Sequence, residues 1–210
     1  MDCTNKKGLR VVYGDYTLGV HGEGFDYIFS YAQGGLESIV KNGYEWLYRC
    51  PKPTFWRALT DNDRGSKFHI KSGSWLAADM FIDCKDVEVI MDGVSQGKPV
   101  APGNNKYGSD VYASNVIVKY IYETVTTPAT TIEVIYDVAD NGRITVSVLY
   151  KGVQGLPELP VFGLRFIMPT LADKYMYQGL SSETYPDRMA GAVKGVYEVN
   201  DLNERREQFC

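Results

Sequence analysis

Apolar and polar residues alternate along most of this chain, and the alternation is clearest between residues 131 and 150. In residues 131–138 every second side chain is apolar, and the same pattern returns in residues 144–150. Side chains on a β-strand point to opposite faces in turn, so each stretch predicts a strand with one buried face. The sequence Asp140-Asn141-Gly142 between them is typical of a tight turn, so the two strands should form a hairpin.

Further strands are predicted by short runs of β-branched and aromatic residues that are bounded mainly by glycine, aspartate or asparagine. These runs cover residues 9–13, 16–20, 25–31, 36–40, 45–48, 116–123 and 162–168. Helix signal is confined to residues 74–81, where Ser74 stands at a suitable N-cap position. Many short strands with little helix predict an all-β fold, in which antiparallel sheets form a sandwich or a barrel.

Composition and charge narrow the classes of partner. The formal net charge is −4, and no run rich in lysine and arginine occurs, so we expect neither nucleic acid nor an anionic membrane surface as a partner. No apolar run reaches membrane-spanning length, and the first residues lack the apolar stretch of a secretory signal. We therefore expect a cytoplasmic protein. The 16 tyrosines suit β-sheets, although some could instead serve as platforms for sugar rings.

Cysteine and histidine usage argues against a metal site. The cysteines are widely scattered: Cys3, Cys50, Cys84 and Cys210. None belongs to a Cys-x-x-Cys pair, and only His21 and His69 could act as further ligands. We therefore expect no zinc site and reduced thiols, as in most cytosolic proteins.

Two segments combine aromatic residues with a dense group of polar ones. In the first, Phe55 and Trp56 lead directly into Arg57-Ala58-Leu59-Thr60-Asp61-Asn62-Asp63-Arg64-Gly65. We predict an extended segment that carries polar groups to a shaped surface, with Gly65 permitting a turn that other residues resist. The second is Gly179-Leu180-Ser181-Ser182-Glu183-Thr184-Tyr185-Pro186-Asp187-Arg188.

Together these segments resemble two motifs of the small chain, the C-terminal sandwich domain, of family-2 β-galactosidases. The first motif, R-A-x-x-D-N-D-x-G in that family, is complete here from Arg57 to Gly65. The second retains the residues from Gly179 to Arg188 that define it, except that Ser181 stands where the family often has its second glycine. The resemblance runs from near Leu9 to about Arg188.

The resemblance implies a fold, a domain and a partner. The fold would be the supersandwich of two antiparallel sheets found in galactose mutarotases, with residues 1–210 as one domain that is incomplete at its C-terminus. The chain would be a non-catalytic subunit that packs on a large β-galactosidase chain, because in the family the catalytic glutamates lie in a separate barrel domain. The assembled enzyme would hydrolyse lactose and other β-galactosides. This chain would hold no cofactor, and Mg and Na, where the enzyme uses them, would lie on the large chain.

The resemblance also implies that the loop after the first motif borders the sugar site. The candidate residues for this border, or for an interface, are Arg57, Asp61, Asn62, Asp63, Gly65, Ser66 and His69. The second motif adds Gly179, Glu183, Tyr185, Asp187 and Arg188.

A plainer interpretation of both motifs stays open. The side chains of residues 61–63 could cap neighbouring amides in a turn, and Asp187 and Arg188 could form ion pairs with Arg57 and Asp63. Asp61 and Asp63 would share one face of an extended segment, but nothing else supports the paired carboxyls of a glycosidase, so we assign no catalytic residue.

Two other functions remain possible from the sequence. One is an autonomous aldose mutarotase, which needs a histidine acid and a carboxylate base and could only draw on His21 or His69. The other is a carbohydrate-binding module without catalysis.

Overall fold

The computed structural model describes residues 8–103, 111–181 and 191–200. The chain divides into two compact units, Met1–Pro169 and Thr170–Cys210. The single domain expected from the sequence stays a prediction, because the two units are described separately. None of the described helices is long and apolar enough to cross a membrane.

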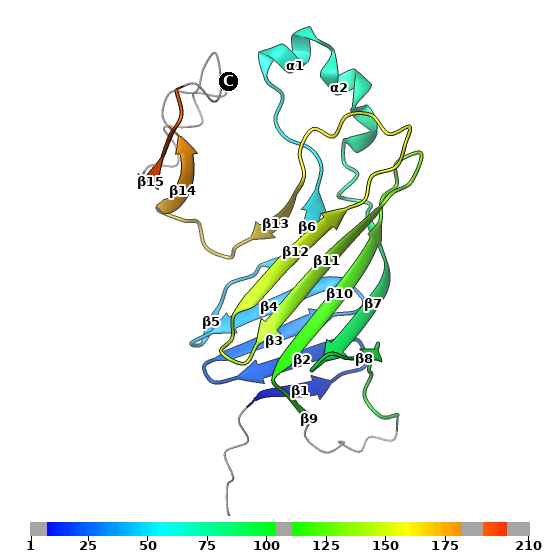
Figure 1. Ribbon diagram of the computed structural model, residues 1–210, viewed down its shortest axis with the longest axis vertical. Coiled ribbons are helices and arrows are strands. Elements are labelled where there is room, and N and C mark those ends of the chain that lie inside the picture. Colours follow the sequence, from blue (N-terminus) through cyan, green and yellow to red (C-terminus); the bar gives the residue numbers. More distant parts are fainter. Residues whose placement is uncertain (1–7, 104–110, 182–190, 201–210) are drawn as a thin grey trace, which may run out of the picture. The chain divides into compact units, whose positions relative to one another are not determined.

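The first unit contains two large antiparallel sheets (Figure 1). The six-stranded sheet has the order β5-β4-β3-β2-β1-β9, and each strand pairs antiparallel to its neighbour. Its strands are β1 (Leu9–Tyr13), β2 (Thr17–Gly22), β3 (Phe25–Ser30), β4 (Gly35–Lys41), β5 (Tyr44–Glu45) and β9 (Val111–Ala113). The first four confirm the predicted runs to within about two residues at their ends.

The second sheet has the order β12-β11-β10-β7-β8. Its strands are β7 (Asp83–Met91), β8 (Val94–Gly97), β10 (Asn115–Glu123), β11 (Thr131–Ala139) and β12 (Ile144–Tyr150). The predicted hairpin is confirmed. The amide of Gly142 donates to the carbonyl of Ala139 at 2.9 Å, and Gly142 has the positive φ (77°) that this turn requires.

β6 (Arg49–Thr54) pairs antiparallel with β13 (Gly163–Ile167) in a smaller sheet beside the sandwich. Three short helical segments follow β6: α1 (Asp61–Gly65), α2 (Phe68–Lys71) and the 3-10 turn η1 (Gly73–Trp75). The helix predicted for residues 74–81 is therefore wrong beyond Trp75. Leu76 is already extended (φ −63°, ψ 122°) and Ala77 has a positive φ of 61°, so the helical path cannot continue.

The strand predicted for residues 45–48 is also wrong beyond its first residue. The Glu45 carboxylate accepts hydrogen bonds from the amides of Ile39 and Leu47 at 3.0 and 2.9 Å. These bonds draw the chain into a turn at the point where the apolar pattern suggested that the strand would continue.

The two large sheets face each other across one apolar core. Residues of β10 and β11 alternate between half-buried and buried positions without interruption, as predicted. The inward side chains of β10 are Val116, Val118, Tyr120 and Tyr122, and all are fully buried. The ring of Tyr136 on β11 meets Phe29 on β3 edge-on, with the ring centroids 5.7 Å apart, so aromatic residues join the two layers.

Tyrosine hydroxyls bond the second sheet to glycine carbonyls on the first. Tyr120 donates to the carbonyl of Gly35 at 3.1 Å, and Tyr122 donates to the carbonyl of Gly34. Tyr27 on β3 donates in the reverse direction, to the carbonyl of Gly142 at 2.6 Å. Burial raises the pKa of the Tyr122 hydroxyl well above its ordinary value, so it stays a donor. A buried hydroxyl needs such a partner, so these bonds set how the sheets align.

The second unit contains one described hairpin. β14 (Tyr175–Ser181) pairs antiparallel with β15 (Val193–Val199), and the rings of Tyr177 and Tyr197 stack with their centroids 5.4 Å apart.

A matched pair of glycine substitutions tests the packing at Gly34. Gly34 and Gly43 both have positive φ, 60° and 77°, so alanine is strained at either position by about 1–2 kcal/mol. A Cβ at Gly34 would also lie 2.4 Å from the Cβ of Cys84, whereas nothing lies within 4 Å of one at Gly43. We expect Gly34→Ala to lower the free energy of unfolding by about 1–3 kcal/mol more than Gly43→Ala does, measured by urea denaturation. Equal losses would show that the turn at Gly34 adjusts freely.

Candidate functional site

The first motif begins at Phe55, which anchors it to the core. Phe55 is fully buried, and its ring lies 5.4 Å from that of Trp75 and 6.3 Å from that of Phe162. The indole N–H of Trp75 donates to the carbonyl of Pro157 at 3.1 Å. The segment that carries the motif is therefore fixed at its start by aromatic packing, and η1 and the loop before β13 pack against the same group.

Residues 61–65 then form the short helix α1, so the prediction of an extended segment is wrong. Thr60 is the N-cap, and its hydroxyl accepts a hydrogen bond from the amide of Asp63 at 3.2 Å. In return, the Asp63 carboxylate accepts from the amide of Thr60 at 2.8 Å. This reciprocal pair is a capping box, which satisfies amides that have no partner within the helix. The predicted capping role of the motif is confirmed at Asp63.

The Asp63 carboxylate also accepts hydrogen bonds from both terminal nitrogens of Arg57. The Arg57 Nη1 and Nη2 atoms lie 2.5 and 3.1 Å from the two carboxylate oxygens. Arg57 further donates to the carbonyls of Ala58 and Pro160, and its guanidinium lies 5.9 Å from the ring centre of Phe68. A bidentate arginine–carboxylate pair fixes orientation as well as charge. Arg57 therefore ties the start of the motif to α1 and to the loop at Pro160.

The hydrogen bonds that the Asp63 carboxylate accepts keep it ionised near neutral pH. Its pKa is lowered, first by the hydrogen bonds from Arg57 and then by the bond from the Thr60 amide. The pKa of Arg57 is raised, mainly by its hydrogen bonds to Asp63. A carboxyl with a lowered pKa stays ionised near neutral pH, so the charge pair with Arg57 persists there.

The remaining residues of the first motif do not converge on one site. Asp61 pairs with Arg64 one helical turn away at 2.6 Å, but its side chain is 90% exposed, against 13% for Asp63. Asn62 is exposed, and the Ser66 hydroxyl donates to the carbonyl of Asp63 at 3.3 Å. The expected role of Gly65 is wrong, because the residue with left-handed backbone is Lys67 (φ 58°) and Gly65 ends α1.

His69 lies on α2, half-buried, and its Nδ1 atom is buried without a hydrogen-bond partner in the described part of the chain. The segment from α2 to the start of β7, to which His69 belongs, exposes large apolar side chains. These are Ile70, Leu76, Met80 and Phe81. An exposed group of this kind is typical of a surface that another protein covers.

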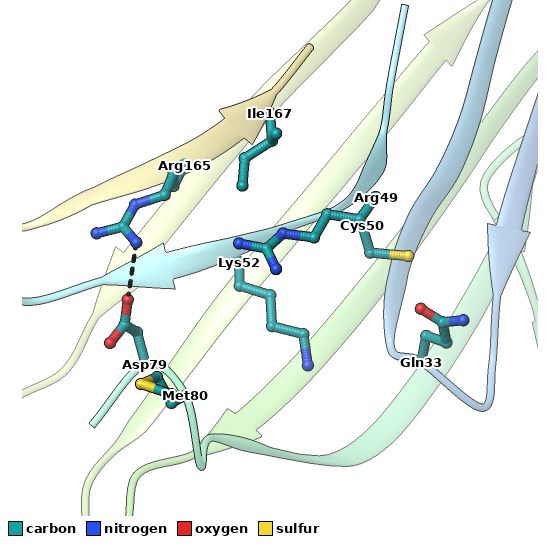
Figure 2. Close-up of a pocket in the computed structure, with 8 residues that line it drawn as sticks. All are labelled: Gln33, Arg49, Cys50, Lys52, Asp79, Met80, Arg165 and Ile167. Carbon is teal, nitrogen blue, oxygen red and sulfur yellow. Dashed lines mark ion pairs between the residues drawn. The ribbon is translucent and has the colours of Figure 1, made fainter. Parts of the chain in front are cut away.

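A cavity of about 420 Å³ lies beside the end of this segment, since Met80 contributes to its lining, and the sequence did not predict it. Figure 2 shows its lining residues, which are Gln33, Arg49, Cys50, Lys52, Asp79, Met80, Arg165 and Ile167. Arg165 pairs with Asp79 at 3.4 Å, which leaves the lining predominantly cationic. No motif marked these positions, since Arg49, Lys52 and Arg165 come from two strands about 110 residues apart that only the fold pairs.

The second motif lies largely outside the described residues. Glu183, Tyr185, Asp187 and Arg188 fall there, together with the ion pairs expected of the last two. Gly179 is described, and it lies on β14 opposite Gly195 of β15.

The other candidate ligands and acids occupy ordinary positions. His21 on β2 faces Asp26 on β3, with its Nδ1 atom 2.6 Å from the carboxylate. Within residues 8–103, 111–181 and 191–200, no three His, Cys, Asp or Glu side chains are grouped so that they could hold a metal ion. Cys50 and Cys84 are free thiols, and burial raises the pKa of the Cys50 thiol to about 11, which keeps it protonated.

Comparison with known proteins points to one family. Residues 21–208 match the family described as β-galactosidase small chain. The chain is 58% identical over 202 residues to a β-galactosidase small subunit of Latilactobacillus sakei, which covers 96% of this chain and 63% of that protein. It is 36% identical over 191 residues to a β-galactosidase of Clostridium acetobutylicum, covering 90% of this chain and 19% of that one. For a β-galactosidase of Streptococcus thermophilus, the identity is 32% over 196 residues, covering 93% and 17%. The chain thus spans less than two thirds of the first relative and less than a fifth of the other two.

Two aspartate substitutions in the same helix separate the capping pair from a surface ion pair. We expect Asp63→Asn to lower the free energy of unfolding at neutral pH, because it removes the bidentate partner of Arg57. Asp61→Asn should change it by no more than about 0.5 kcal/mol, because the Asp61 side chain is solvent-exposed. Urea denaturation of both variants at neutral pH measures the difference, and equal effects would contradict the role given to Asp63.

The same pair predicts a pH dependence. The folded-state pKa of Asp63 is lowered, so its contribution is complete above the unfolded-state pKa of about 3.9 and is lost as pH falls through the folded-state pKa. The stability difference between wild type and Asp63→Asn should therefore be constant from pH 7 to pH 5 and shrink below about pH 4. A difference that persists unchanged in acid would show that the ionised carboxylate is not what stabilises the fold.

Proposed function

The chain belongs to the β-galactosidase small-chain family, and on that premise we propose that it is the small, non-catalytic component of a β-galactosidase. In the relatives, the matching region is part of a protein named as a small subunit or a minor fraction of a longer β-galactosidase. Both arrangements fit a module that works together with a larger chain. The proposed role is to pack on that chain and to help border its sugar site.

This proposal depends on the ion pairs that Asp61 and Asp63 of the first motif form. Retaining hydrolysis of a glycoside needs two carboxyls about 5–5.5 Å apart, one of them protonated to act as the acid. Here Asp63 is held as an anion by Arg57, and Asp61 pairs with Arg64 in solvent. Each carboxylate is thus committed to an arginine of its own segment. We infer that the motif shapes the loop through Ser66 and His69, and that the catalytic carboxyls lie on the large chain.

The exposed apolar segment supports a protein partner. Ile70, Leu76, Met80 and Phe81 lie within 16 residues of the end of α1, and all are exposed. Contact with a large chain would remove them from water and would hold the motif against that chain.

The remaining parts of the proposal concern the assembled enzyme. We propose β-galactosides, lactose among them, as its substrates. Mg and Na, where the enzyme uses them, would be bound by the large chain. A cytoplasmic location is supported by the two free thiols of the described residues, since such thiols persist in reducing compartments.

Replacement within a relative tests the proposal directly. The region of the Latilactobacillus sakei small subunit that matches this chain would be exchanged for it, giving a hybrid small chain of full length. We expect the hybrid, mixed with the large chain of that enzyme, to hydrolyse nitrophenyl β-galactoside at least about tenfold faster than either chain alone. The 210-residue chain by itself should give no hydrolysis above background. Unaided hydrolysis that requires Asp61 or Asp63 would overturn the non-catalytic role.

The same hybrid locates the contact with the large chain. Ile70→Asp should weaken assembly by about tenfold or more, because it would bury an unpaired carboxylate. Val94→Asp on β8 is the matched control, since the two side chains are similarly exposed, 67% and 62%. Assembly would be measured by titrating the hybrid against a fixed amount of large chain and following activity. Equal losses in the two variants would place the contact elsewhere.

Two measurements on the isolated chain distinguish the alternative functions. Polarimetry of fresh α-galactose would reveal a mutarotase, with a rate above the spontaneous one that His21→Gln or His69→Gln abolishes. Tryptophan fluorescence titrated with galactose or lactose would reveal a carbohydrate-binding module. We expect neither signal, because His21 is engaged with Asp26 and the cavity beside Met80 is lined by neither histidine.

A further inference from the structure

The pairing of β6 with β13 is irregular, and this irregularity decides which side chains share a face. Lys52 lies opposite Arg165 and Arg49 lies opposite Ile167, so β6 has one residue more than β13 between the two pairs. An extra residue of this kind is a β-bulge. In a regular strand, residues 49 and 52 would point to opposite faces, because side chains alternate. The bulge instead turns Arg49 to the face that carries Lys52, and bulges often re-aim a side chain in this way.

Pro51 accounts for the position of the bulge. It lies between Arg49 and Lys52, within the stretch where the register shifts. Proline has no amide to donate to a ladder, and within sheets it is found at edges and bulges. The short sequence Arg-Cys-Pro-Lys therefore places two cations of β6 on one face.

This face forms one wall of the cavity of about 420 Å³ that Figure 2 shows, which we call the bulge cavity. β6 and β13 contribute Arg49, Lys52, Arg165 and Ile167 to its lining. The other lining residues are Gln33, Cys50, Asp79 and Met80. Cavities of roughly 300–1,000 Å³ are typical of sites for small molecules, so the bulge cavity has the size of a ligand site.

The cations of the bulge cavity are only partly neutralised by the protein. Arg165 donates to the hydroxyl of Thr54 at 2.8 Å and pairs with Asp79 at 3.4 Å. Figure 2 marks an ion pair for Arg165 but none for Arg49 or Lys52 among the residues that it draws. The charge of Asp83 also acts on Lys52, but the Asp83 carboxylate is paired with Lys85 at 2.7 Å.

Two like charges face each other across the two strands. Lys52 lies directly opposite Arg165, and like charges at such positions are destabilising. Asp79 is the one carboxylate of the lining, against three cations, so the lining keeps a net charge of +2. An anion between the cations would remove this repulsion.

We propose that the bulge cavity binds the phosphate group of a small phosphate monoester, with the organic part of that molecule beside Met80 and Ile167. A phosphate monoester carries a charge of about −2 at neutral pH, which matches the charge of the lining. Its oxygens accept hydrogen bonds from guanidinium and ammonium groups, and a planar guanidinium can bind two of them at once.

The size of the cavity and its apolar residues favour a monoester over free phosphate. The cavity is larger than inorganic phosphate needs, and Met80 and Ile167 offer no hydrogen bonds to a bare anion. The inference rests on the geometry of β6 and β13 and not on the proposed role in a β-galactosidase, so the two can fail independently.

Calorimetric titration of the 210-residue chain tests the inference. The probes are glucose 6-phosphate, inorganic phosphate and glucose. We expect glucose 6-phosphate to bind at least about threefold more tightly than inorganic phosphate, because its organic part adds contacts within the cavity. Glucose, which carries no charge, should give no binding at concentrations up to about 10 mM.

Two arginine substitutions form a matched pair. Arg49 and Arg143 are both exposed and each substitution by glutamine removes one positive charge, but Arg143 lies just before β12 and does not line the cavity. Arg49→Gln should weaken binding of glucose 6-phosphate by about tenfold or more, because it removes a charge-assisted hydrogen bond. Arg143→Gln should leave the affinity within about twofold.

A third substitution should change the affinity in the opposite direction. Asp79→Asn removes the carboxylate of the lining and releases Arg165 from its ion pair. It should therefore strengthen binding of glucose 6-phosphate by about threefold or more. A variant that only disturbs the fold would weaken binding, so the direction of the change distinguishes the two effects.

Four results would overturn the inference. Glucose 6-phosphate could fail to bind at concentrations up to about 10 mM. Arg49→Gln and Arg143→Gln could weaken binding equally, which would assign it to overall charge. Asp79→Asn could weaken binding, which would show that the charges of the lining do not determine affinity. Lastly, equal affinities for the two phosphates would identify free phosphate as the ligand instead of a monoester.

Discussion

The hydrogen bonds from Tyr120 and Tyr122 to the turn at Gly34 and Gly35 are the contacts on which the rest of the structure depends. They join the middle strand of one sheet to the start of β4 in the other. A net hydrogen bond is worth only about 1 kcal/mol, but a buried hydroxyl left without an acceptor costs more, so other alignments of the sheets are disfavoured. The glycine carbonyls are reachable because no side chain stands in the way, as the close approach of Cys84 to Gly34 shows.

This turn also positions the first motif. A Cβ built at Gly35 would lie 3.3 Å from the Cβ of Cys50, so β6 runs directly past the turn. Phe55 follows β6 at once and enters the aromatic group with Trp75, and Arg57 then joins α1 through Asp63. A chain of contacts thus leads from the centre of the sandwich to the surface that carries the motif. It explains how a polar segment at the surface is held so firmly. Bidentate charge pairing with a capped helix gives this segment one shape.

The sequence predicted the strands correctly where apolar and polar residues alternate regularly. It failed where helix capping and turn residues override that alternation. Strict alternation identified β10, β11 and β12, because each has one face against the core. The short helix α1 was missed although Thr60 and Asp63 stand three residues apart, the spacing of a capping box, because the preceding aromatics suggested a strand. The helix after Ser74 was expected from its apolar residues, but the backbone at Ala77 ends it. The acceptors of Tyr120 and Tyr122 lie 85 and 88 residues away, so no local pattern could reveal them.

The apolar segment from α2 to the start of β7 differs in kind from the polar motif before it. Its side chains Ile70, Leu76, Met80 and Phe81 are exposed, and they stand on short helices and turns whose backbone bonds are largely made internally. Arg57 and Asp63, by contrast, make their charge pair and hydrogen bonds within the first unit. Exposed apolar side chains on a backbone that already has its hydrogen bonds can be covered by any surface of complementary shape, which is how subunits of an enzyme meet. A contact with this part of the chain would therefore use the apolar side chains of residues 70–81 and leave the charge pair of the motif undisturbed.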